Sequence, residues 1–462
     1  MSKAIPQPPG IPILGNIFDV NPNETWNSLN TLAKKYGPIF KIKILSKQIV
    51  FVGSVSLLQE ICDERRFRKC VAPPIVEIRH AVHDSLFSAY DCEESWGIAH
   101  RIMAPMVTAS ANLAVFGRMR QTVFDLIKKW TSGSNQPVLV TDVLSRLIML
   151  SELLCFFDQR LPLLEGPEHP MLKAMEGATW EAVKRPTRPK VINWLFYKRK
   201  FDNDTKTMRD FAASIVETRK SQPTERKDML HMLLEGKDPD TGKSLTDSQV
   251  IDEIITLFIG CSTAPHLVSY TLYYLLKNPQ ELTKAREEID AVIGTGQIED
   301  QHLSQLPYCE AILRESLRLC ATAPGLNIEP VPPAEDPSAP VLLASGEYQI
   351  PQGQVIIAIL GAVNRDPEYF PDPEAFQPQR MFGENYDRLP PACKKGFGNG
   401  KRECFGKLYA LQWSLLTLVS ILKDVHFELA DKRYELKSNG SFNVLPQQLF
   451  LLVGPRKRTT AA

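Results

Sequence analysis

One ten-residue segment near the C-terminus constrains this chain more than any other, because it places a cysteine between a glycine turn and a helix. Residues 397–406 read Phe-Gly-Asn-Gly-Lys-Arg-Glu-Cys-Phe-Gly. The two glycines and the asparagine allow a tight backbone turn, and the apolar pattern over about 405–424 predicts a helix. A thiol at a helix N-terminus, beside Lys401 and Arg402, is expected to have a lowered pKa and to be held as thiolate.

The cysteine of this segment, Cys404, has two interpretations. A single thiolate among backbone N–H donors suits one axial bond to a heme iron, whereas the alternative is a structural cysteine buried in a glycine turn. The segment closely resembles the heme-binding loop of the cytochrome P450 family, Phe-Gly-x-Gly-x-Arg-x-Cys-x-Gly, and every fixed position of that pattern is present. The resemblance implies that Cys404 is the iron ligand, that Phe397 packs against the thiolate side, and that Arg402 pairs with a heme propionate.

The composition is that of an ordinary globular protein and excludes several other classes. Hydrophobic residues make up 44% and charged residues 23% of the 462 residues, which excludes a disordered or collagen-like chain. The net charge of +1 predicts no nucleic-acid partner. The nine cysteines have no CxxC spacing and fit a reducing compartment. With no signal peptide and no run of about 20 uninterrupted apolar residues, we expect a soluble, cytoplasmic protein without a membrane anchor.

Residue patterns along the chain predict a mainly α fold with a small β subdomain. β-rich runs occupy 38–53, which reads as a hairpin, and about 330–360, with more short strands at the C-terminus. Helical periodicity dominates about 55–330 and returns at about 405–424. The family resemblance covers essentially the full chain and implies that residues 1–462 form a single heme-thiolate catalytic domain with the cytochrome P450 fold.

The segment from about 247 to 276 predicts a long buried helix. Thr246 and Gln249 have the spacing of a capping box, and the body that follows is apolar nearly all round. Pro265 interrupts it. Because proline lacks an N–H and crowds the carbonyl four residues back, we expect a kink there that leaves the Cys261 carbonyl free for water or ligand.

The resemblance gives this helix a catalytic role. In the family, a Gly-x-acid-Thr sequence lies over the distal face of the heme and organises the water that delivers protons. Residues 260–263, Gly-Cys-Ser-Thr, occupy these positions, which makes Ser262 and Thr263 the catalytic candidates. Ser262 replaces the acid, and a hydroxyl relays a proton but is not its source at neutral pH. His266, one turn on, either joins this relay or is a packed or solvated histidine.

Two further constellations support the resemblance. Glu315 and Arg318 are neighbours on one helix face, and the sequence FQPQR follows at 376–380. The family pattern implies that Glu315, Arg318 and Arg380 form a buried structural network below the heme, although Gln379 stands where the family often has glutamate.

Trp96 and His100 are four residues apart and can face the same way from a helix. Read alone, they are a core tryptophan and a surface histidine. The family pattern makes Trp96, His100 and also Lys69 candidates for contact with the heme propionates.

Segments such as GPIFKI, LYYLLKNP and TAPG look most similar to the self-sufficient fatty-acid hydroxylases, in which a heme domain is fused to a diflavin reductase. The similarity puts Phe87 over the heme beside the substrate and puts Ala323 and Pro324 on the other side. Lys47 and Phe51 lie at the channel mouth, where those enzymes keep a basic residue and a tyrosine for the substrate carboxylate. Phe51 lacks that hydroxyl, so carboxylate binding is weakened. Without the similarity, Lys47 is an ordinary hairpin lysine and Phe87 a core residue.

The resemblance therefore implies a heme-thiolate monooxygenase that hydroxylates or epoxidises an apolar substrate, such as a fatty acid or a polyketide-like acyl chain. Heme b is the cofactor, and electrons come from NADPH through the FAD and FMN of a diflavin reductase, fused or separate. A basic patch of Lys394, Lys395, Lys401 and Lys407 either docks the flavin domain or is a solvated surface.

Because Ser262 replaces the acid, two alternatives stay open. One is a heme-thiolate enzyme with different chemistry: peroxide-dependent oxidation, hydroperoxide rearrangement, dehydration or nitrogen-oxide chemistry. The other is a heme- or ligand-binding protein without catalysis.

Overall fold

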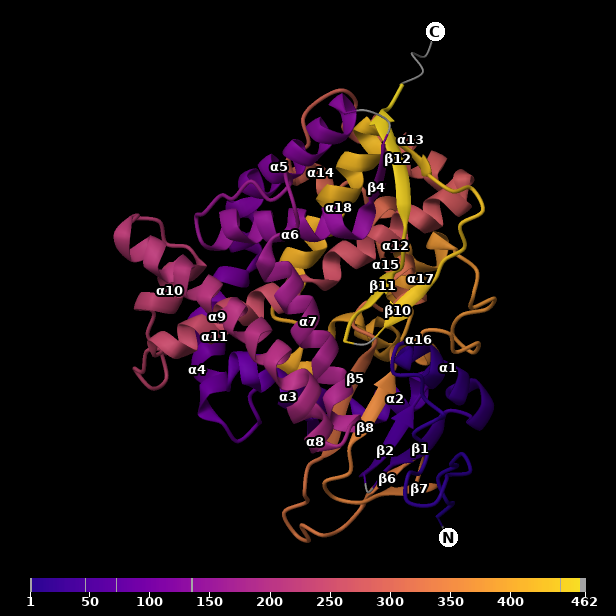
Figure 1. The fold of residues 1–462 in the computed structure, drawn as a ribbon. Coiled ribbons are helices and arrows are strands. Elements are labelled where there is room, and N and C mark those ends of the chain that lie inside the picture. The colour runs from indigo at the N-terminus through magenta and orange to yellow at the C-terminus, as the bar shows by residue number, and fades with distance from the viewer. Residues whose placement is uncertain (1, 46, 72, 134–135, 441, 458–462) are drawn as a thin grey trace.

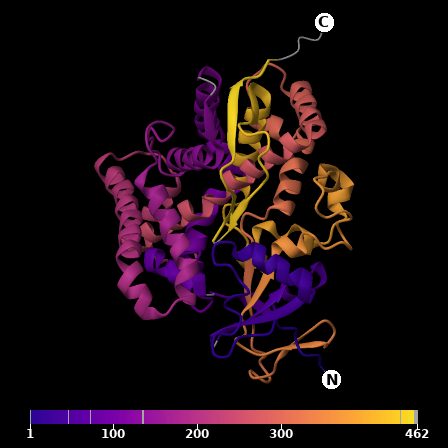
Figure 2. The same cartoon turned by 45° about the vertical axis from the view of Figure 1, so that its right-hand side comes forward.

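The computed structural model describes residues 2–45, 47–71, 73–133, 136–440 and 442–457. Helices form most of the molecule, and the strands gather into small sheets (Figure 1). The predicted mainly α fold with a small β portion is confirmed. The turned view shows that strands from the N-terminal part, in indigo, and strands coloured orange lie together beside the helices (Figure 2).

The helical part is built from helices that bury at least one face. Its main members are α3 (Pro73–Val82), α4 (Glu94–Met103), α5 (Ala109–Ser132), α6 (Val140–Phe156), α7 (Pro170–Lys184), α9 (Lys198–Ser221), α10 (Met229–Glu235), α13 (Pro279–Val292), α15 (Pro307–Leu319) and α18 (Lys407–Asp424). Shorter helices are α1 (Thr25–Tyr36), α2 (Val55–Ile61), α8 (Lys190–Ile192), α14 (Asp300–Leu303), α16 (Leu360–Val363) and α17 (Gly383–Asp387). Tyr409 and Trp413 on α18 are fully buried at the centre of the largest apolar cluster.

The largest sheet has five strands in the order β1 (Ile39–Ile44), β2 (Lys47–Val52), β8 (Ile356–Ile359), β5 (Gly325–Pro330) and β3 (Phe67–Lys69). β1 and β2 form the predicted hairpin, with Ile39 opposite Val52 and Ile44 opposite Lys47. A three-stranded sheet joins β4 (Pro137–Leu139), β12 (Phe450–Pro455) and β9 (Val425–Leu429). Two small pairs are β6 (Val341–Leu343) with β7 (Tyr348–Ile350) and β10 (Ser438–Gly440) with β11 (Val444–Pro446).

The long apolar segment forms two helices in succession, α11 (Asp247–Cys261) and α12 (Thr263–Lys277). α11 begins with the predicted capping box: the Gln249 amide donates to Thr246 Oγ1 at 3.3 Å, and the Thr246 amide donates to Gln249 Oε1 at 3.0 Å. By length and composition the two together could cross a membrane. Most of the apolar stretch is buried inside the molecule, as in the core helix of a globular protein.

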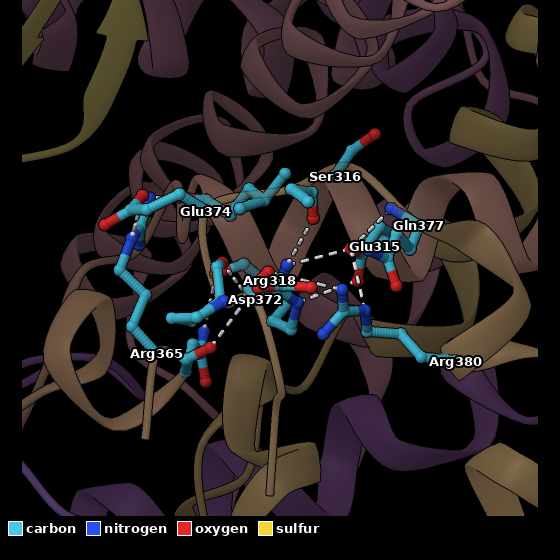
Figure 3. A network of polar contacts seen from close by, with 12 residues as sticks. Glu315, Ser316, Arg318, Arg365, Asp372, Glu374, Gln377 and Arg380 are labelled. Atoms are coloured by element: carbon cyan, nitrogen blue, oxygen red, sulfur yellow. Dashed lines mark hydrogen bonds and ion pairs between the residues drawn. The ribbon is translucent and has the colours of Figure 1, made fainter. Parts of the chain in front are cut away.

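A buried ion pair ties α15 to the coil that follows β8 (Figure 3). The side chains of Glu315 and Arg318 are 0% and 1% exposed, and two hydrogen bonds of 2.7 and 2.8 Å join them. The same guanidinium donates to the main-chain carbonyls of Asn364, Pro373 and Ala375 at 2.9, 2.7 and 3.1 Å. The coil is therefore held by charge-assisted hydrogen bonds where its own backbone has no regular partner.

Arg380 approaches the same carboxylate from the short 3-10 helix Pro378–Met381. Its Nε lies 3.3 Å from Glu315 Oε1. Gln379, which replaces the expected glutamate, points to a different carboxylate: its Nε2 donates to Glu281 Oε2 at 3.2 Å and to the Tyr308 hydroxyl at 2.8 Å. The glutamine therefore adds a neutral link to α13 and α15 without disturbing the charged network.

Replacing Arg318 with methionine is predicted to destabilise the protein by roughly 3 kcal/mol, because the buried Glu315 carboxylate loses its two hydrogen bonds to Arg318 and keeps Arg380 as its remaining cation. The free energy of unfolding from urea titration measures this loss. The matched control is Arg388→Gln, which breaks an exposed pair with Glu384 and should cost less than about 1 kcal/mol. Equal effects of the two substitutions would contradict a structural role for the buried network.

Candidate functional site

A cavity of about 1100 Å³ lies where the α11–α12 junction, the segment 396–406, the segment 322–328 and the β1–β2 hairpin meet. Nearly all the residues singled out from the sequence line it. They are Cys404, Phe397, Arg402, Trp96, His100, Lys69, Phe87, Ala323, Pro324, Lys47, Phe51 and Thr263. Among the catalytic, heme and substrate candidates, Ser262 is the one that is absent from the described lining.

The backbone of the segment 397–406 folds so that the cysteine faces the cavity. Gly398 and Gly400 have φ values of 93° and 54°, a left-handed conformation that favours glycine. The Cys404 amide closes the turn by donating to the Phe397 carbonyl at 2.7 Å. A Cβ on Gly400 would lie only 2.0 Å from the Glu64 carboxyl carbon, so the Glu64 side chain would have to shift, while the positive φ is what favours glycine here.

The predicted lowering of the Cys404 pKa is wrong for this structure. Removal from bulk water raises the pKa of the thiol, the Glu403 carboxylate raises it further, and a hydrogen bond from the Gly406 amide opposes both. The neighbouring Lys407 is paired with Glu403 at 2.9 Å, and α18 begins only at Lys407. The loop therefore presents a neutral thiol to the cavity, and coordination to a metal ion is what deprotonates such a thiol.

One edge of the cavity is positively charged. Arg402 lies 3.2 Å from Asp91 and donates to the Ala89 carbonyl at 2.9 Å, and its guanidinium lies 5.0 Å from the centre of the Trp96 ring. Lys401 contacts the other oxygen of Asp91 at 2.9 Å. A single carboxylate thus serves two cations, and burial lowers the pKa of the Arg402 guanidinium.

A third cation lies at the same edge. Lys69 Nζ donates to the Phe87 carbonyl and lies 4.6 Å from the centre of the Phe87 ring. Burial, helped by repulsion from Arg402, lowers the pKa of Lys69 to about 7. His100 stacks beside Trp96 at 5.1 Å, and burial lowers the pKa of its ring. The positive charge here exceeds its carboxylate partners, so this edge suits a ligand that brings carboxylates of its own.

The break between α11 and α12 also borders the cavity. The sequence predicts the kink at Pro265, but the first helix already ends at Cys261 and Ser262 is a turn residue. The physical reason is the one expected: Pro265 cannot donate to the Cys261 carbonyl. Thr263 Oγ1 donates to the Gly260 carbonyl at 3.3 Å at the cavity wall.

The Ser262 hydroxyl has two hydrogen-bond partners, one of which, Asn443, lines the cavity. It donates to the Ile259 carbonyl and accepts from Asn443 Nδ2, both at 2.7 Å. Asn443 lies just before β11 and was not singled out from the sequence, where nothing distinguishes it from an ordinary turn asparagine. His266 is packed, since its side chain is buried and burial lowers its pKa to about 4. His266 therefore has the packed position, and the relay role of Ser262 stays a prediction.

Sequence reasoning also missed an acid beside the break. Glu152 on α6 is 1% exposed, and it hydrogen-bonds Cys261. Burial raises its pKa well above the ordinary value, so the carboxyl is neutral. The signal was present in the sequence as a glutamate inside the apolar run MLSELLCFF, because a charged residue in a fully buried helix needs an explanation.

The part of the cavity away from the cations is apolar. The Phe87 ring meets the Phe442 ring edge to face at 6.0 Å, and the Val444 amide donates to the Thr322 carbonyl at 3.0 Å just before Ala323. Phe51 is 2% exposed and stacks on Phe40 at 5.1 Å. These contacts leave the mouth lined by hydrocarbon, with the exposed Lys47 at its rim.

The four lysines of the basic patch all have partners. Lys401 and Lys407 bind the carboxylates of Asp91 and Glu403. Lys394 donates to the Asp387 carbonyl at 3.1 Å and Lys395 to the Asn399 side chain at 2.6 Å. Part of the positive charge of this patch is therefore neutralised within the protein.

A second buried acid holds the segment that carries Phe87. Glu253 on α11 is 2% exposed and accepts from the Leu86 amide at 2.9 Å. One turn later, Thr256 donates to Ser85 at 2.7 Å. Burial raises the pKa of Glu253 to about 8, so a neutral carboxyl fixes the backbone beside the cavity.

Comparison with known proteins gives one consistent match. The family model described as cytochrome P450 matches residues 5–453. A bifunctional cytochrome P450/NADPH–P450 reductase of Aspergillus oryzae is 36% identical over 459 residues, covering 98% of this chain and 42% of that protein. A self-sufficient cytochrome P450 monooxygenase of Exserohilum turcicum is 36% identical, covering 99% of this chain and 43% of that protein. The chain thus spans less than half the length of these relatives.

Stability is predicted to fall as the pH rises towards 8, in part because of Glu253. Between about pH 4.3, the ordinary pKa of glutamate, and about pH 8, the folded protein holds a proton that the unfolded chain has lost. Stability therefore decreases through this window, by up to about 1.4 kcal/mol per pH unit. Glu253→Gln should flatten the dependence of the unfolding free energy on pH, whereas Glu217→Gln, at an exposed position of α9, should leave it unchanged. Parallel profiles for wild type and Glu253→Gln would contradict a neutral buried carboxyl.

Proposed function

The chain belongs to the cytochrome P450 family, and from that premise we propose that it is the heme-thiolate catalytic domain of a monooxygenase that hydroxylates or epoxidises an apolar substrate. The observation that carries the proposal is the Cys404 thiol, which faces a cavity of about 1100 Å³ with excess positive charge at one edge and a helix break at its border. The fatty-acid or polyketide-like acyl chain expected from the sequence fits the apolar half of this cavity.

The residues present fit a heme. Cys404 would hold the iron, and the Gly406 amide hydrogen bond to its sulfur would stabilise the negative charge of the bound thiolate. Lys69 and Arg402 would pair with the two propionates, with Trp96 and His100 beside them, and this pairing would remove the mutual repulsion that lowers the Lys69 pKa. When bound, the heme supplies the redox centre at which dioxygen is activated.

Proton transfer would then fall to Thr263, and the exclusion of water would fall to apolar residues of the cavity wall. Thr263 Oγ is the hydroxyl at the break that lines the cavity, so it would hold a water and pass a proton across the distal wall. Ser262 would act with Asn443 to fix the shape of the break. Phe87, Ala323 and Pro324 would exclude water from the reacting carbon.

A substrate carboxylate would pair with Lys47 at the rim of the cavity mouth. Phe51 offers it no hydroxyl as a second partner. We therefore propose that the enzyme orients its substrate mainly through apolar contact. Apolar contact favours the binding of medium or long acyl chains over the binding of short-chain acids.

Electrons would come from NADPH through the FAD and FMN of a diflavin reductase, fused or separate. The support is that relatives carry the names of P450–reductase fusions and that this chain spans less than half their length. All nine cysteines are free, which supports a reducing compartment and the cytoplasm as the proposed location.

One observation favours a second candidate. Ser262 stands at the position that the acid has in the distal pattern. Its hydroxyl donates to the Ile259 carbonyl and accepts from the Asn443 side chain. A distal pattern with a hydroxyl in place of its acid suits a heme-thiolate reaction that needs no proton delivery from this helix, such as oxidation driven by hydrogen peroxide or rearrangement of a hydroperoxide.

The heme-thiolate assignment is tested by the absorption spectrum of the reduced protein with carbon monoxide. We predict a Soret band shifted far to the red in the wild type and no such shift in Cys404→Ser. Cys92→Ser, at an exposed cysteine, is the matched control and should keep the shifted band. An unshifted band in wild-type protein that has taken up heme would refute thiolate ligation.

Replacing Thr263 with alanine separates the two candidate functions. If dioxygen is used, the ratio of product formed to NADPH consumed with a reductase should fall by roughly tenfold or more, because the proton relay is lost. Turnover driven by hydrogen peroxide should persist. Thr263→Ser, which keeps the hydroxyl, should retain most of the coupling. Unchanged coupling in Thr263→Ala would point to the second candidate.

A further inference from the structure

A buried acid lies directly behind the cavity wall at the helix break. Glu152 on α6 is absent from the described lining of the cavity, whereas Cys261 belongs to it. The Cys261 thiol donates a hydrogen bond to the Glu152 carboxyl. Cys261 is also the last residue of α11, and its carbonyl is the one that Pro265 leaves without a helical donor. A carboxyl group thus lies one side chain behind the point where the distal helix opens.

Packing of α6 against α18 fixes the position of this acid. Trp413 Nε1 donates to the Ser151 hydroxyl at 3.1 Å, and the Tyr409 ring lies 4.5 Å from the Phe156 ring. Contacts to α18 therefore anchor α6 on both sides of Glu152 in the sequence. The carboxyl is held on a rigid helix and does not depend on a mobile side chain or loop.

No positive charge neutralises the acid among the described residues. Burial is the main influence on the carboxyl, followed by the Cys261 thiol. The other titratable groups that interact with it are Cys155 on α6 and Tyr409 on α18, which are neutral when protonated. Because burial raises the pKa of Glu152 well above its ordinary value, the carboxyl keeps its proton at neutral pH, as a proton donor must.

Two buried polar atoms in this region have no hydrogen-bond partner among the described residues. They are Glu152 Oε1 and Ser414 Oγ, and both side chains are 1% exposed. Ser414 lies on α18 and lines the cavity. Buried polar atoms of this kind take water as a partner. The region between Glu152 and the cavity therefore offers polar sites at which water would connect the two.

We propose that Glu152 is the carboxylic acid that supplies protons to the distal side of the cavity, a role for which position 262 has only a hydroxyl. The proton leaves the Glu152 O–H for a water at the Cys261 carbonyl. That water passes one of its own protons to the water held by Thr263. The carboxylate left behind keeps its hydrogen bond from Cys261 and takes back a proton from water that enters through the cavity mouth.

This inference deepens the proposed function and rests on it. A reaction that uses dioxygen consumes protons in the cavity, whereas hydrogen peroxide brings its own. An acid on α6 would supply the protons that the Ser262 hydroxyl cannot generate, which favours the dioxygen reaction over the second candidate. The placement of Glu152 behind the break does not depend on either reaction, so it is tested separately.

Infrared spectroscopy of the holoenzyme tests whether the acid carries a proton. At neutral pH the C=O stretching bands of protonated carboxyl groups should include one from Glu152 and one from Glu253. Glu152→Gln should remove one of these bands and Glu253→Gln a different one. This measurement needs no turnover. A band pattern that is unchanged in Glu152→Gln would overturn the inference.

The ratio of product formed to NADPH consumed, with a diflavin reductase, tests the role of the proton. Glu152→Gln keeps the size of the side chain and an acceptor for Cys261 but has no acidic proton, so the ratio should fall roughly tenfold or more. Glu152→Asp keeps the acid and should retain most of the coupling. Glu168→Gln, at a partly buried carboxyl outside the described lining, is the matched control and should leave the ratio unchanged.

Two outcomes of the coupling assay contradict the inference. One is an unchanged ratio in Glu152→Gln. The other is an equal loss in Glu152→Gln and Glu152→Asp, because a purely structural role depends on shape and not on the proton. The carbon monoxide spectrum separates this failure from failure of the proposed function. A red-shifted band with unchanged coupling refutes the role of Glu152 alone, whereas an unshifted band in heme-loaded wild type refutes the heme-thiolate enzyme itself.

Discussion

The buried contact between Glu315 and Arg318 connects parts of the chain that have little other reason to stay together. α15 is a regular helix, but the segment from Asn364 to Gln377 is mostly coil, and its carbonyl groups and the Gln377 amide find partners in these two side chains. The same helix supports the cysteine loop, because Leu317 packs against Gly396. A charged pair without access to water is costly to form and more costly to break. It therefore fixes one arrangement of a region that hydrophobic packing alone would leave loosely defined.

Residue patterns predicted much of this molecule because several signals are local. The hairpin at 38–53, the capping box of α11 and the glycine turn before Cys404 each depend on residues within a few positions of one another, and each is present. The identity of the cavity-lining residues came from resemblance to a family, since Lys69 and Arg402 are far apart in the sequence. Local sequence signals do not show that two residues far apart in the sequence lie close together in the fold.

The failures have a common physical origin in tertiary packing. The pKa of Cys404 was expected to be low because of Lys401 and Arg402, but both cations are paired with Asp91 and burial raises the pKa of the thiol. The partner of the Ser262 hydroxyl was not foreseen either, since Asn443 lies 181 residues away in the sequence. In both cases a partner distant in the sequence decided the outcome. Glu152 could have been noticed, because an acid in an apolar helix is visible without a structure.

The turn before β11 limits what amino-acid substitutions in this protein can achieve. Phe442 contacts Phe87 on the apolar wall, Asn443 holds Ser262 at the helix break, and the Val444 amide binds Thr322 beside the opposite wall. Three neighbouring residues thus control the shape offered to substrate and the geometry of the distal helix together. A substitution in this turn that widens substrate choice will also disturb the helix break, so selectivity and efficiency are inherited as one trait. Variation that improves one without the other must arise elsewhere in the cavity wall.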